Sequence, residues 1–207
     1  MPTLLHLAAS PRGALSFSNS AARSTIARLR DSIPNLTIVE RQLGQTPLPP
    51  VDQHLVAASL MPAAQRGAAE LAALALSEQL IVELEVASIV LISTPMYNFT
   101  VPAALKNWLD YVVRPHRTFA LSAAGKAGML ADLPVRVLMA SGGPVHPLHD
   151  FATPYLRHVF QTIGLADFEA IHLEQMLRGE DAVARSQQQL TRWQVGFVEQ
   201  MQVRLRV

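Results

Sequence analysis

Short apolar runs alternate along the chain with longer segments in which apolar positions recur at helical spacing. The runs are typical of strands, because they are brief and rich in Val, Ile and Leu. The strand-like runs lie at 3–10, 36–43, 88–94, 136–143 and 167–174. The helix-like segments lie at 18–32, 67–84, 102–113, 150–163 and 180–202. The run SIVLIST (88–94) is almost continuously apolar, which indicates a strand that is covered on both faces.

This alternation predicts a doubly wound α/β fold, with a five-stranded parallel sheet and helices on both faces. Five strands in 207 residues favour the flavodoxin-like arrangement over a full dinucleotide-binding fold. The segment GQTPLPPVD (44–52) is predicted to be a loop, because its prolines do not fit regular structure. No repeat or linker divides the chain, so residues 1–207 are predicted to form a single domain.

Composition narrows the class of protein. Half of the residues are hydrophobic and 16% are charged, which excludes a disordered chain and favours extensive burial, including burial in a subunit interface. The net charge of +1 gives no reason to expect binding to nucleic acid or to an anionic membrane. The absence of cysteine excludes disulfides and thiolate catalysis and is compatible with the cytoplasm. We expect neither a signal peptide nor a membrane span.

Serines crowd the segment after the first predicted strand, SPRGALSFSNS (10–20). Free N–H groups at the start of a helix, together with serine hydroxyls, form a ready site for an anion. An ordinary polar loop with an N-cap serine is the alternative interpretation. Neither the P-loop pattern nor G-x-G-x-x-G is present, so this segment alone does not decide between the two.

Two further unusual segments follow strands. In PMYNF (95–99), Tyr97 and Phe99 offer apolar walls and Asn98 offers a donor and an acceptor, although such a corner can also serve packing alone. In ASGGP (140–144), paired glycines allow a ligand to approach the backbone, or form only a turn. Since ligands bind beyond the carboxyl ends of the strands in such sheets, the three segments together indicate one site for a flat, polar-edged ligand.

The motifs PMYNF (95–99), LKNWLDYVVR (105–114) and TF (118–119) resemble those of the FMN-dependent NADH–quinone oxidoreductases, also called FMN-dependent azoreductases. Other parts of the chain are similar to further motifs of this family, namely SFSN (16–19), GG (142–143) and TPYLRHVFQTIG (153–164). The resemblance implies a flavodoxin-like homodimer that binds one FMN per subunit. It also implies NADH or NADPH as electron donor and a small quinone or azo compound as acceptor.

By position, the resemblance implies three groups of FMN-binding residues. The phosphate side of FMN is expected to bind at Ser10, Ser16, Phe17 and Ser18. The isoalloxazine is lined by Met96, Tyr97, Asn98 and Phe99, and its other edge is approached by Ala140, Ser141, Gly142 and Gly143. No side chain is assigned as a catalytic group, because the flavin carries the redox chemistry in a ping-pong sequence and solvent supplies the protons.

The chain departs from the family pattern near the expected substrate mouth. Pro115, His116 and Arg117 replace a small neutral turn, ALSAAGKAG (120–128) replaces a polar and aromatic stretch, and Ala140 and Ser141 stand where Ser–Arg is frequent. Phe119 and Phe151 are predicted to be aromatic walls of the substrate pocket. Arg117 is predicted to bind the extra phosphate of NADPH or an anionic acceptor, with a solvated rim charge as the alternative.

A flavodoxin-type electron carrier that docks redox proteins is the alternative function. Such carriers tend to be shorter and acidic, whereas this chain is near neutral and has additional segments at 44–66 and 115–133. His146, His149 and Asp150 lack a further ligand set, so no metal is predicted.

Several other residues are given packing or surface roles. His6 is expected to be a core or rim histidine with satisfied hydrogen bonds, and Trp193 and Phe197 are expected to pack together on the last helix. Four glutamates are expected to be solvated, namely Glu70, Glu78, Glu83 and Glu85.

Overall fold

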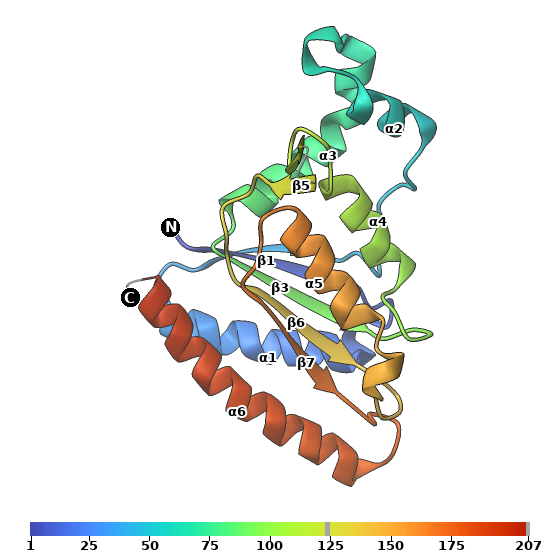
Figure 1. The fold of residues 1–207 in the computed structure, drawn as a ribbon. Helices are drawn as coiled ribbons and strands as arrows, with labels where there is room; N and C mark the ends of the chain where they lie inside the picture. Colours follow the sequence, from blue (N-terminus) through green and yellow to red (C-terminus); the bar gives the residue numbers. More distant parts are fainter. Residues whose placement is uncertain (123–124, 206–207) are drawn as a thin grey trace.

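A five-stranded parallel sheet forms the centre of the protein in a computed structural model that describes residues 1–122 and 125–205 (Figure 1). The strands are β1 (Thr3–Ala8), β2 (Thr37–Arg41), β3 (Ile89–Pro95), β6 (Val135–Ala140) and β7 (Phe168–Leu173). Their order across the sheet is β2-β1-β3-β6-β7, and each neighbouring pair is parallel. The predicted doubly wound flavodoxin-like fold is therefore confirmed.

Helices cover both faces of the sheet (Figure 1). One face carries α1 (Phe17–Ser32) and α6 (Glu180–Arg204), whose apolar side chains pack with those of β1, β3 and β7. The other face carries α3 (Ala68–Val86), α4 (Ala103–Val112) and α5 (Ala152–Thr162), with Trp108 fully buried between them and the sheet. All five helices were predicted within a few residues of their observed bounds.

The helix starts follow from local sequence. Ser16 caps α1 by accepting a hydrogen bond from the Asn19 N–H at 3.2 Å. Asp150 Oδ1 accepts from the N–H groups of Ala152 and Thr153, at 3.0 and 2.9 Å, and so satisfies the first turn of α5. These caps place the starts of α1 and α5 at the carboxyl edge of the sheet.

The sequence pattern missed two elements. Helix α2 (Gln53–Leu60) follows the proline-rich loop and begins at Asp52, which accepts from the Leu55 N–H at 2.9 Å. A hairpin of β4 (Phe119–Ser122) and β5 (Gly125–Gly128) forms a separate two-stranded sheet. Three short 3₁₀ helices complete the fold: η1 (Gly13–Leu15), η2 (Ala63–Gln65) and η3 (Pro147–His149). Ala123 and Ala124, within the 120–128 departure, and the last two residues of the predicted domain lie outside the described residues.

Two findings limit the kinds of site. In residues 1–122 and 125–205, no helix is long and apolar enough to cross a membrane. Over the same residues, no group of three or more His, Asp or Glu side chains is placed to hold a metal ion. His146 and His149 instead lie with their rings 5.4 Å apart, centroid to centroid.

Candidate functional site

The three segments singled out from the sequence meet at the carboxyl edge of the sheet. The N–H of Ala9, at the end of β1, donates to the Ser93 carbonyl of β3 at 2.8 Å. The N–H of Met96, just past β3, donates to the Ala140 carbonyl at the end of β6, also at 2.8 Å. Backbone hydrogen bonds thus fix the segments 10–20, 95–99 and 140–144 side by side.

The start of α1 has the character of an anion site. Ser10, Ser16 and Ser18 are all buried, and the hydroxyls of Ser16 and Ser18 lie 3.1 Å apart. The first-turn N–H groups of Phe17 and Ser18 find no acceptor among the described residues, as expected at a helix N-terminus. Buried hydroxyls and free amides at the positive end of a helix dipole match the chemistry of a phosphate.

Gly44, in the loop after β2, holds this segment in place from outside it. Its N–H donates to the Ala8 carbonyl at 3.0 Å. A Cβ at position 44 would lie 2.3 Å from the Ser10 carbonyl carbon and 2.6 Å from the Pro11 nitrogen, both of which are backbone atoms. The chain therefore needs a glycine here so that two loops can approach closely. The sequence pattern predicts only a loop at position 44 and does not predict its contact with Ser10 and Pro11.

The corner after β3 is a strained two-residue turn. The N–H of Tyr97 donates to the Thr100 carbonyl at 2.9 Å, and the N–H of Thr100 donates back at 3.1 Å. Both central residues have positive φ, 47° at Asn98 and 70° at Phe99, as in type I′ turns. Positive φ is unusual for a residue as bulky as phenylalanine, and such strain concentrates at ligand sites.

Hydrogen bonds to the carbonyls of the turn after β6 hold that turn in place. The Ser141 hydroxyl donates to the Gly143 carbonyl at 2.6 Å, and the carbonyls of Ser141, Gly142 and Gly143 accept from the chain after β7. The N–H groups of Gly142 and Gly143 have no acceptor among the described residues, and the same holds for Asn98 and Phe99. Two adjacent turns therefore present unpaired backbone donors at one edge.

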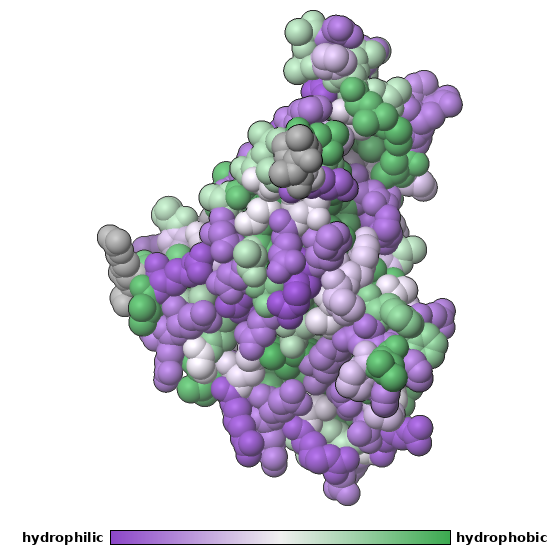
Figure 2. Space-filling view, viewed as in Figure 1, coloured by the Kyte–Doolittle hydropathy of each residue, from purple (hydrophilic) through white to green (hydrophobic). Residues whose placement is uncertain are grey.

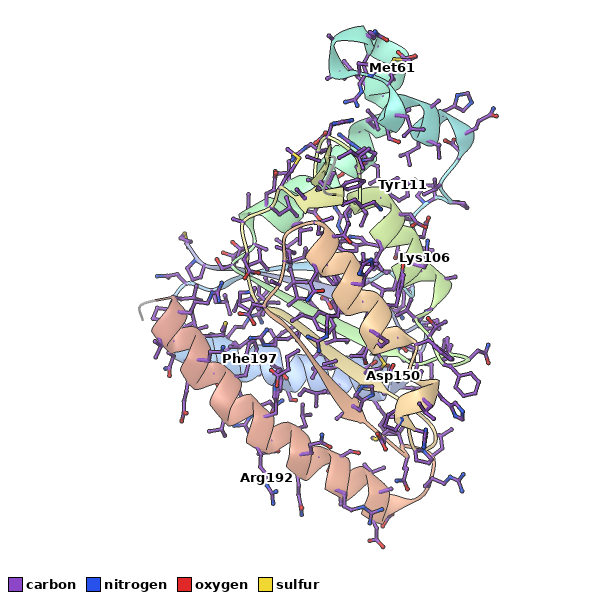
Figure 3. All side chains as sticks on the ribbon, in the orientation of Figure 1. Met61, Lys106, Tyr111, Asp150, Arg192 and Phe197 are labelled. Atoms are coloured by element: carbon purple, nitrogen blue, oxygen red, sulfur yellow. The ribbon has the colours of Figure 1, made fainter. Side chains whose placement is uncertain are left out.

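Exposed aromatic side chains surround these donors. Tyr97, Phe99 and Phe151 are 41%, 55% and 59% exposed, and the Phe151 N–H donates to the Phe99 carbonyl at 3.1 Å. The His149 ring meets the Phe99 ring edge-on at 5.7 Å. Figure 2 shows hydrophobic atoms where η3 meets the start of α5, and Figure 3 shows Asp150 beside the carboxyl ends of β6 and β7.

This donor set fits FMN part by part. The serine-rich start of α1 suits the phosphate, and the unpaired amides of the two turns suit the polar edge of the isoalloxazine. Exposed aromatic rings suit its flat faces. The structure brings together all twelve residues predicted to bind the cofactor, and Phe151 lies beside them.

Within one subunit, Phe119 lies apart from Phe151, the other predicted wall of the substrate pocket, and a substrate role for Phe119 stays a prediction. Phe119 is only 6% exposed and lies in the β4–β5 hairpin, with the Lys126 ammonium 5.0 Å above its ring. The hairpin adjoins the residues after α5, because the Leu130 N–H donates to the Ile163 carbonyl at 3.0 Å. Phe151 precedes α5, whose 11 residues span about 16 Å. The two rings therefore lie at opposite ends of one helix.

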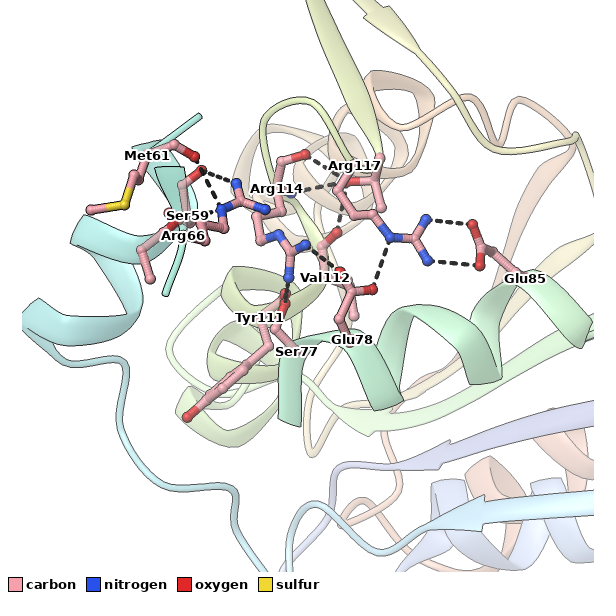
Figure 4. Close-up of polar contacts among 12 residues, drawn as sticks. Ser59, Met61, Arg66, Ser77, Glu78, Glu85, Tyr111, Val112, Arg114 and Arg117 are labelled. Atoms are coloured by element: carbon pink, nitrogen blue, oxygen red, sulfur yellow. Dashed lines mark hydrogen bonds and ion pairs between the residues drawn. The ribbon is translucent and has the colours of Figure 1, made fainter. Parts of the chain in front are cut away.

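Arg117, predicted to bind an anionic group of the substrate, pairs with two carboxylates in the structure (Figure 4). Its guanidinium donates to both carboxylate oxygens of Glu85, at 2.5 and 2.9 Å, and to Glu78 at 2.9 Å. Two carboxylates on α3 therefore already pair with this guanidinium, whose side chain is 26% exposed, and its role toward a substrate stays a prediction. Arg114, only 3% exposed, binds Glu78 from the other side and Ser77 Oγ at 2.9 Å.

The expectation that four glutamates are solvated holds only in part, because the Glu78 and Glu85 side chains are 42% and 38% exposed but also pair with arginine. Besides Glu78 and Glu85, Glu83 pairs with Arg41, and Glu70 accepts from the Gly67 N–H at 2.9 Å at the start of α3. Arg117 donates to Glu85 and lowers its carboxyl pKa. Burial acts to raise the pKa of Glu78, but the hydrogen bonds from Arg117 and Arg114 outweigh it and the pKa is lowered.

Two packing predictions are confirmed. Trp193 and Phe197 stack with their ring centroids 4.8 Å apart on α6. His6 is 2% exposed and both of its ring nitrogens have polar partners.

Comparison with known proteins first gives the class. The sequence profile of the flavodoxin-like fold matches residues 2–195. Among solved structures, an azoreductase from Bacillus anthracis str. Sterne superposes with a TM-score of 0.85 at 22% identity, covering 97% of this chain and all of the other. An FMN-dependent NADH-azoreductase from Bacillus anthracis str. Ames Ancestor, solved in complex with FMN, gives a TM-score of 0.84 at 19% identity, covering 96% and 100%. These structures establish a flavodoxin-like α/β protein.

Closer relatives give the family. FMN-dependent NADH:quinone oxidoreductase 2 of Cupriavidus pinatubonensis is 52% identical over 197 residues, or 93% of this chain and 96% of the relative. FMN-dependent NADH:quinone oxidoreductase 4 of Pseudomonas fluorescens is 45% identical, over 88% of this chain and 89% of the relative. The chain belongs to the family of FMN-dependent NADH:quinone oxidoreductases.

Proposed function

We propose that this protein is an enzyme that passes electrons from NADH or NADPH, through bound FMN, to quinones or azo compounds. The observation that carries the proposal is the single edge on which the serine-lined start of α1 adjoins two turns with unpaired backbone donors. None of the relatives compared above is named as an electron carrier, so the alternative function gains no support.

The chain's own residues would bind and orient the cofactor. Ser16 and Ser18, with the first-turn amides of α1, would hold the phosphate, and Ser10 would line the same loop. The amides of Asn98, Phe99, Gly142 and Gly143 would hold the polar edge of the ring system, while Tyr97 and Phe151 border its face. When bound, FMN supplies the group that accepts hydride from nicotinamide and reduces the acceptor.

Purification and a steady-state assay test the proposal. We expect a yellow protein that binds FMN and oxidises NADH when menadione is added, with the parallel double-reciprocal lines of a ping-pong sequence. Parallel assays with NADPH and with an azo dye define the preferred donor and acceptor. A protein that binds no FMN, or that binds FMN yet leaves NADH unoxidised, would refute the proposed function.

The same proposal includes a homodimer of single-domain subunits in the cytoplasm. Large apolar side chains are exposed at the α2 end of the molecule, including Val56, Leu60 and Leu71 at 45%, 66% and 60%, and Figure 2 shows hydrophobic atoms there. Apolar surface of this kind is typical of subunit interfaces. Light scattering should give about twice the chain mass of 22.6 kDa, and a concentration-independent mass of one chain would exclude the dimer.

A further inference from the structure

Four side chains form a hydrogen-bonded row that runs from the protein surface into the phosphate loop. His6 Nδ1 lies 3.0 Å from Glu40 Oε1, and His6 Nε2 lies 2.9 Å from Ser93 Oγ. The Ser93 hydroxyl donates to Asn19 Oδ1 at 2.8 Å. His6, Ser93 and Asn19 are at most 4% exposed, whereas the Glu40 side chain is 43% exposed. The row therefore connects solvent to the start of α1 through β2, β1 and β3.

Asn19 joins the row to the segment predicted to hold the phosphate. Its side-chain amide donates to the Gly13 carbonyl at 3.4 Å, and its backbone N–H donates to Ser16 Oγ. Because the amide nitrogen points to a carbonyl, the Oδ1 atom is the one that faces Ser93. Loss or rotation of the Ser93 hydroxyl would therefore move Asn19, which contacts both Gly13 and Ser16.

The complete row requires a proton on both ring nitrogens of His6. The Ser93 hydroxyl has one proton, which it gives to Asn19, so Ser93 must accept its second bond from a proton on His6 Nε2. The Glu40 carboxylate is an acceptor, so the 3.0 Å contact requires a proton on Nδ1 as well. The complete row therefore holds one proton more than a neutral His6 beside an ionised Glu40. When that proton leaves, one link of the row must break.

A cavity gives this proton a route to solvent. The cavity has a volume of about 460 Å³, and both His6 and Asn19 contribute to its wall. The charged groups that line it are Glu40 of β2 and Arg23 and Arg30 of α1. Burial lowers the pKa of His6, Glu40 acts to raise it, and Arg23 lowers it further. The complete row consequently forms on the acid side and is lost as pH rises.

We propose that His6 is a positioning residue for the FMN phosphate, acting through Ser93 and Asn19 on the loop from Gly13 to Ser18. This inference rests on the proposed function, because it concerns the same cofactor. By linkage, a proton that orders the loop strengthens phosphate binding, and bound phosphate in turn favours the proton. FMN affinity should therefore be higher at mildly acidic pH than at alkaline pH, apart from the ionisation of the phosphate itself.

Titrations of the apoprotein with FMN, followed by flavin fluorescence between about pH 5 and pH 8, test this role. The wild-type dissociation constant should rise with pH by roughly three- to tenfold, the equivalent of one hydrogen bond. His6→Asn and Glu40→Gln should flatten this rise, and Ser93→Ala should also do so while Ser93→Thr restores it. His54→Asn, at an exposed histidine of α2, is the matched control and should follow the wild type. The ratio of variant to wild type at each pH removes the ionisation of free FMN.

Riboflavin, which lacks the phosphate, separates positioning from general structure. The variants should weaken FMN binding and leave riboflavin binding nearly unchanged. Equal losses for both ligands at every pH, or pH profiles of all variants that match the wild type, would overturn the inference. Because Glu40 is partly exposed, Glu40→Gln keeps the test valid where a buried variant fails to fold. A wild-type protein that binds no FMN would instead refute the proposed function.

Discussion

Replacing Gly44 with alanine tests how closely the loop after β2 holds the phosphate segment. The new Cβ would lie 2.3–2.6 Å from backbone atoms of Ser10 and Pro11, so one of the two loops must move. Overpacking of this kind costs about 1–3 kcal/mol. For a chain of this size, the melting temperature should fall by roughly 2–12 °C. If the displaced segment loses one hydrogen bond to the charged phosphate, at about 1.5–3 kcal/mol, FMN binding would weaken by roughly ten- to a hundredfold.

Thermal unfolding of the apoprotein and an FMN titration measure the two effects separately, with the titration done where circular dichroism shows the variant fully folded. Gly196→Ala is the control, because a Cβ there meets nothing within 4 Å and alanine favours a helix by about 0.5–1 kcal/mol. That variant should be slightly more stable and bind FMN as the wild type does. A Gly44→Ala protein with unchanged melting temperature and unchanged FMN affinity would refute the close approach.

Three further outcomes follow from the structure. Ser18→Asp should weaken FMN binding by roughly ten- to a hundredfold, because its charge would repel the phosphate at a buried helix start. Ser20→Asp, at an exposed position, should not weaken it. Equal FMN titration curves for the two variants would contradict the phosphate site. Arg117→Ala should leave the ratio of KM for NADPH to KM for NADH unchanged, because Glu78 and Glu85 occupy its guanidinium, and a selective rise for NADPH would show otherwise. Since the folded-state pKa values of Glu78 and Glu85 are lowered, their ion pairs stabilise the fold above about pH 4, and this stabilisation is lost as pH falls further. Each partly exposed pair contributes at most about 1 kcal/mol to the free energy of unfolding. Urea unfolding of Glu85→Gln should therefore differ from wild type at neutral pH and converge with it in acid.

The elements that the sequence predicted are those with a strong local signal. The continuous apolar run of β3 and the Pro–aromatic corner after it are predicted from local sequence alone, without information on the segments that pack against them. Helix α2 was missed because its eight residues are too few for a clear periodicity beside four prolines in residues 47–62. The β4–β5 hairpin was missed because GKAG has no alternation of apolar and polar residues.

Long-range contacts set the surroundings of Arg117 and Phe119, and the sequence pattern reports neither. Arg117 lies 32 residues from Glu85 in the chain and 39 from Glu78, and no local pattern reports a partner at that distance. The motif that ends at Phe119 was correctly read as a family feature, but its position depends on where the hairpin packs, beside the end of α5. Residues that directly follow a strand lie at the predicted edge of the sheet, since strand order alone determines that edge.

A similar distinction separates the residues that hold the flavin from those that adjust how tightly it is held. The residues at the carboxyl edge inherit their positions from backbone bonds between neighbouring strands, such as the bond from Met96 to Ala140, and these depend little on side chains. A second group consists of side-chain contacts across the edge, such as the edge-on contact of His149 with Phe99 and the row from Glu40 to Asn19. Substitutions that displace this backbone, such as Gly44→Ala, should therefore weaken flavin binding, whereas substitutions in the second group should change how tightly, and at which pH, the same flavin is held.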